Sequence, residues 1–128
     1  MQEKTVLVIE DNAMNMKLMR AVLKVGQYRM VESGDAETGI RLAREDRPDL
    51  ILMDIQLPGM DGLSATRLIK ADPDLKHIPV LAMTGYAMED EKRKAMDVGF
   101  AGYIVKPFHV NELLDTISHA FNDPQSEP

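Results

Sequence analysis

The 128-residue chain contains no cysteine, which excludes disulfide bonds and thiolate metal sites. This absence fits a reducing compartment, so we expect a cytoplasmic protein. No apolar run approaches the roughly 20 residues that span a membrane. The chain enters an apolar strand pattern almost at its first residue, so no signal peptide is expected either.

Basic residues are also scarce, with 15 lysines and arginines against 21 acidic residues and a net charge of −6. This balance argues against non-specific binding to nucleic acid. The Gly-x-x-x-x-Gly-Lys-Ser/Thr motif of nucleotide-binding loops does not occur. His77, His109 and His119 lie apart, without metal-ligand spacing, and are predicted to lie at the surface or in loops. The acidic composition favours a hard divalent cation as a ligand over nucleic acid.

The chain does show short apolar runs alternating with longer amphipathic ones. The predicted strands are Thr5–Ile9, Arg29–Glu32, Leu50–Asp54, Pro79–Met83 and Ala101–Val105. The predicted helices are Ala13–Val25, Asp35–Glu45, Leu63–Ala71, Met88–Val98 and Val110–Asn122. The first, third and fourth strands are continuous apolar runs, as in a parallel sheet covered on both faces. We therefore expect an α/β, flavodoxin-like fold with a doubly wound five-stranded parallel sheet of order 2-1-3-4-5.

The length suits one domain. We expect residues 1–122 to form it and the polar, acidic residues 123–128 to be a disordered tail. No second domain for DNA binding or separate catalysis is expected.

Polar residues stand where the predicted strands stop. Glu10 and Asp11 follow the first strand, Asp54 ends the third, Thr84 follows the fourth and Lys106 follows the fifth. The carboxyl ends of parallel strands share one edge of the sheet, which is where ligands bind in such folds. These side chains are therefore predicted to form one site.

Crowded carboxylates raise one another's pKa, and a divalent cation relieves their repulsion. Mg²⁺ prefers oxygen ligands and commonly takes one or two carboxylates together with phosphate. Asp11 and Asp54 are the candidate direct ligands, Glu10 a direct or water-mediated one, and a backbone carbonyl near Gln56 a further one, with Mn²⁺ as a substitute ion. The alternative for Asp11 is a helix cap, together with Asn12, for Ala13–Val25.

Lys106 is the predicted cationic partner of Asp54 and of an incoming phosphoryl group, against the alternative of a solvated surface lysine. Pro107 after it is a candidate for a cis peptide bond. The Thr84 hydroxyl can hydrogen-bond a phosphoryl oxygen, and Gly85 leaves room for a ligand to approach the backbone.

Together these residues resemble the response regulator receiver domain, over Thr5–Phe121. The match rests on Glu10-Asp11, on Asp54 within the motif from Leu52 to Gly62, on Thr84, and on Tyr103 three residues before Lys106-Pro107. The 12–18 stretch and the lack of an output domain are most similar to the stand-alone, single-domain type.

The resemblance implies a two-component phosphorelay protein in which Asp54 accepts a phosphoryl group from a phosphohistidine. It implies that Mg²⁺ is held by Asp11, Asp54 and the Gln56 carbonyl with Glu10 assisting, while Lys106 and Thr84 contact the acyl phosphate. Such a protein is no classical enzyme, although it assists its own phosphorylation and slow dephosphorylation. The donor would be a histidine kinase, a histidine phosphotransfer protein, or both.

The resemblance also implies a switch. Thr84 moves toward the phosphoryl group and Tyr103 fills the vacated space. A partner protein then reads the face formed by Met88–Val98, Ala101–Val105 and Val110–Asn122. The chain departs from the family at Gly85, where alanine is usual. Gln56 and Tyr86 flank the site, and we expect both to tune hydrolysis, with bulky Tyr86 slowing the attack of water.

The Ala13–Val25 helix has an unusually wide apolar face. Met14, Leu18, Ala21, Val22 and Val25 form one stripe, which Met16, Met19 and Leu23 widen. Two interpretations remain. Either the helix is deeply buried against Val110–Asn122, or Met14, Met16, Leu18 and Met19 form a docking face for the kinase or phosphotransfer bundle.

Other functions fit less well. Phosphatases of the haloacid dehalogenase class carry an Asp-x-Asp motif at the end of a strand. Here the residue two positions after Asp54 is Gln56 rather than an aspartate. A flavodoxin needs a phosphate-cradling loop after the first strand, where Glu10-Asp11 would repel phosphate. A receiver that binds partners without phosphorylation is the main alternative, and the complete set of site residues argues against it.

Overall fold

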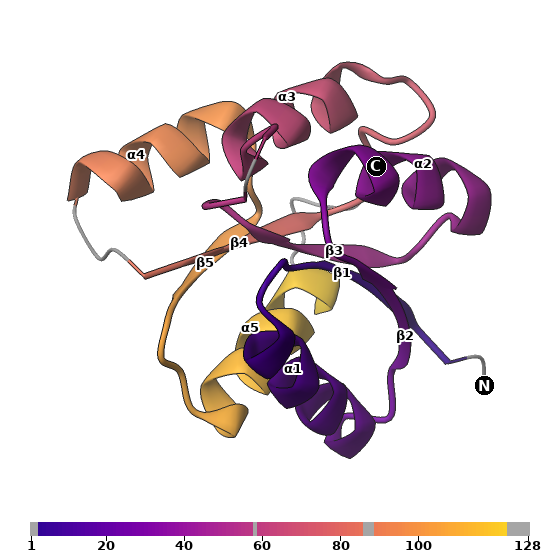
Figure 1. Cartoon of the computed structure of the whole chain (residues 1–128), viewed down its shortest axis with the longest axis vertical. Helices are drawn as coiled ribbons and strands as arrows, with labels where there is room; N and C mark the ends of the chain where they lie inside the picture. Colours follow the sequence, from indigo (N-terminus) through magenta and orange to yellow (C-terminus); the bar gives the residue numbers. More distant parts are fainter. Residues whose placement is uncertain (1–2, 58, 86–88, 123–128) are drawn as a thin grey trace.

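The structure, a computed structural model, describes residues 3–57, 59–85 and 89–122. Five parallel strands form one sheet of order β2-β1-β3-β4-β5, which confirms the predicted fold (Figure 1). The strands are β1 Thr5–Ile9, β2 Arg29–Ser33, β3 Leu50–Asp54, β4 Val80–Thr84 and β5 Gly102–Val105. The helices are α1 Ala13–Val25, α2 Ala36–Asp46, α3 Gly62–Ala71, α4 Glu89–Val98 and α5 Val110–Asn122. Within the described residues, no helix is both long and apolar enough to cross a membrane.

The predicted boundaries of β1, β3, α1 and α5 are confirmed, as is the end of α4, and those of β2, α2, α3, β4 and β5 differ by one residue. Asp35 precedes α2 rather than starting it, because its Oδ1 accepts a 2.7 Å hydrogen bond from the Thr38 backbone N–H as an N-cap. β4 starts and ends one residue later than predicted, so Thr84 lies inside the strand. Met88, predicted to start α4, lies outside the described residues.

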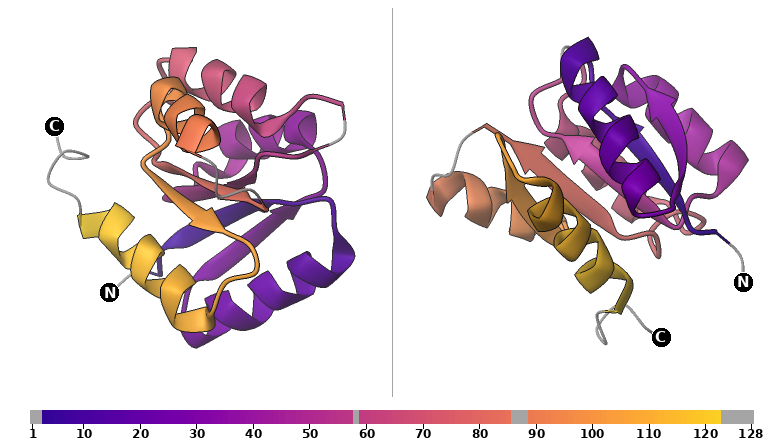
Figure 2. Two further views of the ribbon diagram at one scale, coloured as in Figure 1. Left: turned by 90° about the vertical axis from the view of Figure 1, so that its left-hand side faces the viewer. Right: turned by 90° about the horizontal axis from the view of Figure 1, so that it is seen from below.

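The helices cover both faces of the sheet (Figure 2). α2, α3 and α4 lie on one face, and α1 and α5 lie on the other. All five residues of β3 and of β4 are buried, as expected for central strands with two covered faces. Alternate residues along each strand therefore enter two separate apolar cores.

The α1 helix buries only part of its wide apolar face. Met16, Met19, Val22 and Leu23 form its buried side. The predictions that Met16 and Met19 belong to a docking face are therefore wrong, while Met14 is 76% and Leu18 is 40% exposed. Apolar residues occupy most of the circumference of α1, so hydrophobicity alone does not choose which side faces the sheet.

The start of α3 packs tightly against the end of β3. The Gly62 backbone N–H donates a 3.0 Å hydrogen bond to the Ile55 carbonyl. A Cβ atom at position 62 would overlap the carbonyl oxygen of Asp54 and lie 2.8 Å from Cα of Ile55. Only glycine allows this approach, so Gly62 helps to set the position of the Asp54 backbone.

We predict that Gly62→Ala lowers the free energy of unfolding by about 1–3 kcal/mol, because the backbone must move to admit the methyl group. Gly34→Ala is the matched control, since a Cβ there meets no described residue within 4 Å, and its effect should stay within about 0.5 kcal/mol. Urea unfolding measures both changes. Equal stabilities of the two variants would contradict the close packing at Gly62.

Candidate functional site

Three charged side chains reach the same face of the sheet through strand alternation. Glu10 continues the series of Val6 and Val8, and Asp54 continues that of Leu50 and Leu52, all of which face α1 and α5. Lys106 follows the same rule two residues after Ile104 of β5. Because side chains two residues apart share a face, the carboxyl edge of the sheet gathers these charges on one side.

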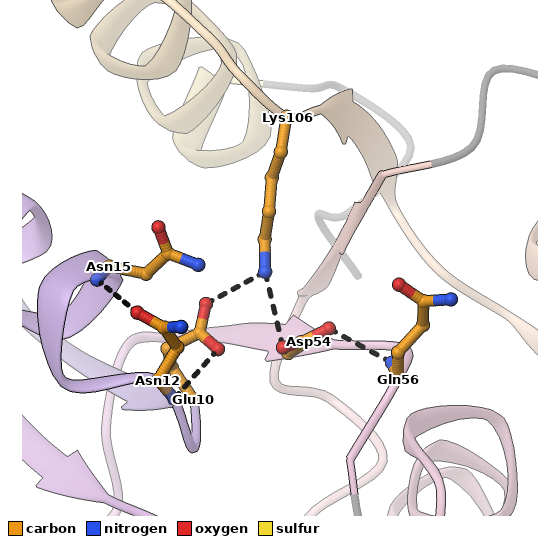
Figure 3. A network of polar contacts seen from close by, with 6 residues as sticks. All are labelled: Glu10, Asn12, Asn15, Asp54, Gln56 and Lys106. Atoms are coloured by element: carbon orange, nitrogen blue, oxygen red, sulfur yellow. Dashed lines mark hydrogen bonds and ion pairs between the residues drawn. The ribbon is translucent and has the colours of Figure 1, made fainter.

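The gathered charges form an ion-pair cluster (Figure 3). Lys106 Nζ lies 2.8 Å from Glu10 Oε1 and 3.1 Å from Asp54 Oδ2. Glu10 is 2% and Asp54 is 4% exposed. The predicted pairing of Lys106 with Asp54 is confirmed. The pairing with Glu10 was missed, although the alternation of residues along the strands could have revealed it.

Backbone donors hold the remaining carboxylate oxygens. The Gln56 N–H donates to Asp54 Oδ1 at 2.9 Å, and the Asn12 N–H donates to Glu10 Oε2 at 3.3 Å. Asn12 is also the N-cap of α1, since its Oδ1 accepts a 2.9 Å hydrogen bond from the Asn15 N–H. Asp11 is therefore not required as a helix cap, and it lies exposed beside the buried pair.

Three carboxylates of this site can hold a metal ion. One ligand oxygen from each of Glu10, Asp11 and Asp54 lies within 4.8 Å of the others. All three are hard oxygen donors, the ligands that Mg²⁺ and Mn²⁺ prefer. The donor set therefore fits a divalent cation.

The negative charge of the carboxylates in this site exceeds the positive charge of Lys106, and this imbalance acts on the pKa values of Glu10 and Lys106. Burial raises the pKa of Glu10, and the adjacent Asp54 raises it further, while Lys106 opposes this rise. Burial alone would lower the pKa of Lys106, but its contacts with Glu10 and Asp54 outweigh burial, and the pKa is raised. One ammonium thus faces more negative charge than it balances.

Thr84 and Tyr103 lie on the other face of the sheet. Thr84 is buried and continues the series of Val80 and Ala82, which belongs to the core beneath α2, α3 and α4. Tyr103 is half-buried, pairs with Ala82 in register, and packs against that same core. Thr84 and Tyr103 are thus diagonal neighbours on adjacent strands.

Thr84, Pro107 and Gly85, which were also predicted to belong to the site, lie next to Lys106 in the chain or at the end of the neighbouring strand. The Lys106 backbone N–H donates a 2.7 Å hydrogen bond to the Thr84 carbonyl, and the Lys106–Pro107 bond is cis, as was considered from the sequence. Gly85 is exposed, and among the described residues a Cβ there would meet only Gln56 Oε1, at 3.9 Å. Within this part of the chain, neither a ligand nor an alanine methyl group would meet a close contact at Gly85.

The remaining predictions concern Tyr86, the C-terminal residues and the three histidines. Tyr86 and residues 123–128 lie outside the described residues. His77, His109 and His119 are exposed, as predicted.

Comparison with known proteins identifies relatives over nearly the whole chain. The family model of the response regulator receiver domain matches residues 6–118. The polar-differentiation response regulator DivK of Brucella anthropi is 42% identical over 120 residues, which are 94% of this chain and 98% of the relative. DivK of Brucella ovis is 41% identical over the same shares. The resemblance to a stand-alone receiver of the DivK type, predicted from the 12–18 stretch and the motifs, is confirmed.

Solved structures agree with the fold. The receiver domain of a sensor histidine kinase from Pseudomonas aeruginosa, solved with a magnesium ion coordinated in its active site cleft, is 32% identical. The similarity covers 95% of this chain and all of that one, with a TM-score of 0.88. The chemotaxis regulator CheY4 of Vibrio cholerae also has a TM-score of 0.88, with 93% and 99% covered, and at 24% identity it shows the fold alone.

The ion pairs lead to a pH prediction. The folded pKa of Glu10 lies above its ordinary value of 4.5, so its contribution to stability is greatest below pH 4.5 and declines as pH rises through the folded pKa. Lys106→Met should raise that pKa further and widen the declining range. Without added divalent cation we expect a loss of about 1–3 kcal/mol at neutral pH, less than for a fully buried pair.

Urea unfolding of both proteins from about pH 4.5 to about pH 8 measures this loss. Lys17→Met removes an exposed lysine of α1 and should leave the pH profile unchanged. A stability loss for Lys106→Met that is the same at every pH would contradict the assigned role of the cation.

Proposed function

Because this chain belongs to the response regulator receiver domain family, whose members are phosphoacceptors in two-component signalling, we propose that Asp54 accepts a phosphoryl group from a phosphohistidine. One observation carries the proposal: the buried Asp54 carboxylate is held between the Lys106 ammonium and the Gln56 backbone N–H. A carboxylate held and oriented by these two contacts is a positioned nucleophile.

The proposed transfer needs little from the protein besides position and charge. One Asp54 oxygen attacks phosphorus, the bond between phosphorus and the donor nitrogen breaks, and an acyl phosphate forms. Each Asp54 oxygen keeps a lone pair beyond the hydrogen bond it accepts. Lys106 has three N–H donors and uses two of them on Glu10 and Asp54 among the described contacts, so one can meet a phosphoryl oxygen.

We propose that Mg²⁺, with Mn²⁺ as a substitute, is held by Glu10, Asp11, Asp54 and the Gln56 carbonyl. The acidic cluster supports this assignment, as does the magnesium ion in the cleft of the Pseudomonas aeruginosa receiver. When bound, the ion neutralises charge on the phosphoryl oxygens. Gln56, whose backbone N–H contacts Asp54, and Tyr86 are proposed to tune hydrolysis of the acyl phosphate.

The proposed switch runs through Thr84 and Tyr103 to the face of α4, β5 and α5, which an output partner reads. The diagonal placement of these side chains supports it, because a shift of Thr84 opens or closes space beside the ring. A groove of about 380 Å³ between β5 and α5 includes Tyr103, Asp115 and His119 in its lining.

The donor protein is proposed to be a histidine kinase or phosphotransfer protein that docks beside the site. Met14 and Leu18 are exposed on α1, whose first turn follows Asp11. Of the four residues predicted for docking, these two remain candidates. Residues 1–122 are proposed as the receiver unit, which the family match over residues 6–118 supports.

The first test is phosphorylation by acetyl phosphate with Mg²⁺, followed by intact-mass and peptide mass spectrometry. We expect one phosphoryl group on Asp54 in the wild type, none on Asp54→Asn, and a large loss of labelling when Mg²⁺ is chelated. Asp46→Asn removes an exposed acid of α2 and should label normally.

Failure of the wild type to label, or labelling of Asp54→Asn at the same position, would overturn the phosphoacceptor assignment. The first of these results would favour a receiver that binds partners without phosphorylation.

The second test addresses the switch. Phosphorylation should change amide hydrogen exchange in β5 and α5 of the wild type, and Tyr103→Ala should lose most of this change while still labelling at Asp54. Tyr28→Ala is the control, because Tyr28 packs in the core on the other face. An unaltered exchange response in Tyr103→Ala would remove Tyr103 from the switch.

A further inference from the structure

The three carboxylates of the acidic cluster are not held equally well by the fold. Asp54 is the last residue of β3, a strand that is buried along its whole length. Glu10 and Asp11 lie outside the strands, in the turn between β1 and α1. The Glu10 N–H donates to the Ser33 carbonyl at 3.0 Å, but among the described residues no hydrogen bond or ion pair reaches Asp11. The position of Asp11 therefore depends on its two neighbours in the chain.

Asn12, the residue after Asp11, joins this turn to α1 (Figure 3). Its backbone N–H donates to Glu10 Oε2 at 3.3 Å, and its side-chain Oδ1 accepts from the Asn15 N–H at 2.9 Å. Its carbonyl accepts from the Met16 N–H at 2.9 Å. The bonds to the first turn of α1 hold Asn12 in an extended conformation, with φ −88° and ψ 120°, and thereby direct its N–H toward Glu10.

The rest of α1 is fixed to the sheet at points away from the cluster. Met19 and Val22 are fully buried, and Arg20 donates two hydrogen bonds to Glu32 of β2, at 2.6 and 2.7 Å. Exposed ion pairs contribute little free energy, so the buried side chains supply most of the anchoring. Loss of the cap would therefore release the turn before α1 while the body of the helix stays in place.

We propose that Asn12 is a positioning residue for the divalent cation, because its side-chain cap sets the backbone of the turn that carries Glu10 and Asp11. This inference rests on the metal site of the proposed function. Without the cap, the Asn12 N–H no longer holds Glu10 Oε2, and Asp11 gains freedom that it must lose when it binds the ion. Ordering this turn then takes up part of the binding free energy.

The alternative is that Asn12 only stabilises α1. Asp35 allows the two roles to be separated, because it caps α2 with the same geometry, its Oδ1 accepting from the Thr38 N–H at 2.7 Å. Serine can replace either cap, whereas alanine cannot. The alanine and serine variants at one position carry the same charge, so the ratio of their metal affinities measures the effect of the cap alone.

Mn²⁺ binding to the full chain, followed by electron paramagnetic resonance of the free ion, measures this affinity without a phosphoryl donor. Asn12→Ala should bind Mn²⁺ about 10-fold more weakly than Asn12→Ser, which is the lower end of the loss seen when an outer partner of a metal ligand is removed. Asp35→Ala should bind as tightly as Asp35→Ser. Asn12→Gly is a second test, because glycine is tolerated at an N-cap but has no side-chain acceptor, and it should bind as weakly as Asn12→Ala.

Labelling of Asp54 by acetyl phosphate gives a second readout that a purely structural role would not change. Asn12→Ala should need about 10-fold more Mg²⁺ than Asn12→Ser for half-maximal labelling, and it should reach the same rate when Mg²⁺ is saturating.

Equal Mn²⁺ affinities of Asn12→Ala and Asn12→Ser would refute the positioning role, and so would an equal loss of affinity in the Asp35 pair. In both cases Mn²⁺ binding by the wild type would leave the proposed metal site intact. Absence of Mn²⁺ binding in the wild type would instead remove the metal site itself, and this inference with it.

Discussion

The burial of two carboxylates at the ends of neighbouring strands is the constraint on which the rest of this structure depends. Glu10 and Asp54 are almost fully enclosed, and a buried charge is costly unless it is paired and hydrogen-bonded. The pairing cation comes from the residue after β5, which is separated from β3 by β4. The site is therefore complete only when the whole sheet is assembled, and folding and function share one set of contacts.

The charges of the same cluster do not cancel, and the excess negative charge favours the binding of a cation. Three carboxylates face one ammonium, and the pKa of Glu10 is raised by burial and by its acidic neighbour. A divalent cation would balance the charge of three carboxylates and one ammonium, and it would thereby offset the negative charge that a phosphoryl group adds. The repulsion among the three carboxylates thus lies at a place where a bound ligand can reduce it.

Much of the site could be predicted because strands have a fixed period and a common edge. Asp54, Lys106 and Glu10 stand at strand ends, and the two-residue alternation places them on one face. The pair of Glu10 with Lys106 was missed because Glu10 was assigned to the metal alone. On α1 the sequence left two interpretations open, and the burial of Met16 and Met19 excludes these two residues from a docking face, while Met14 and Leu18 are exposed. The cis bond before Pro107 could only be considered, since most bonds of this type are trans.

By itself the sequence determined the order of strands and helices, the parallel sheet, and the acids and the lysine at its carboxyl edge. These follow from local apolar patterns and from the geometry that parallel strands share. Only the tertiary structure decided which side of α1 is buried and that Lys106 bridges to a partner 96 residues away. The physical reason is that helix rotation and long-range pairs depend on packing between segments that are distant in the chain.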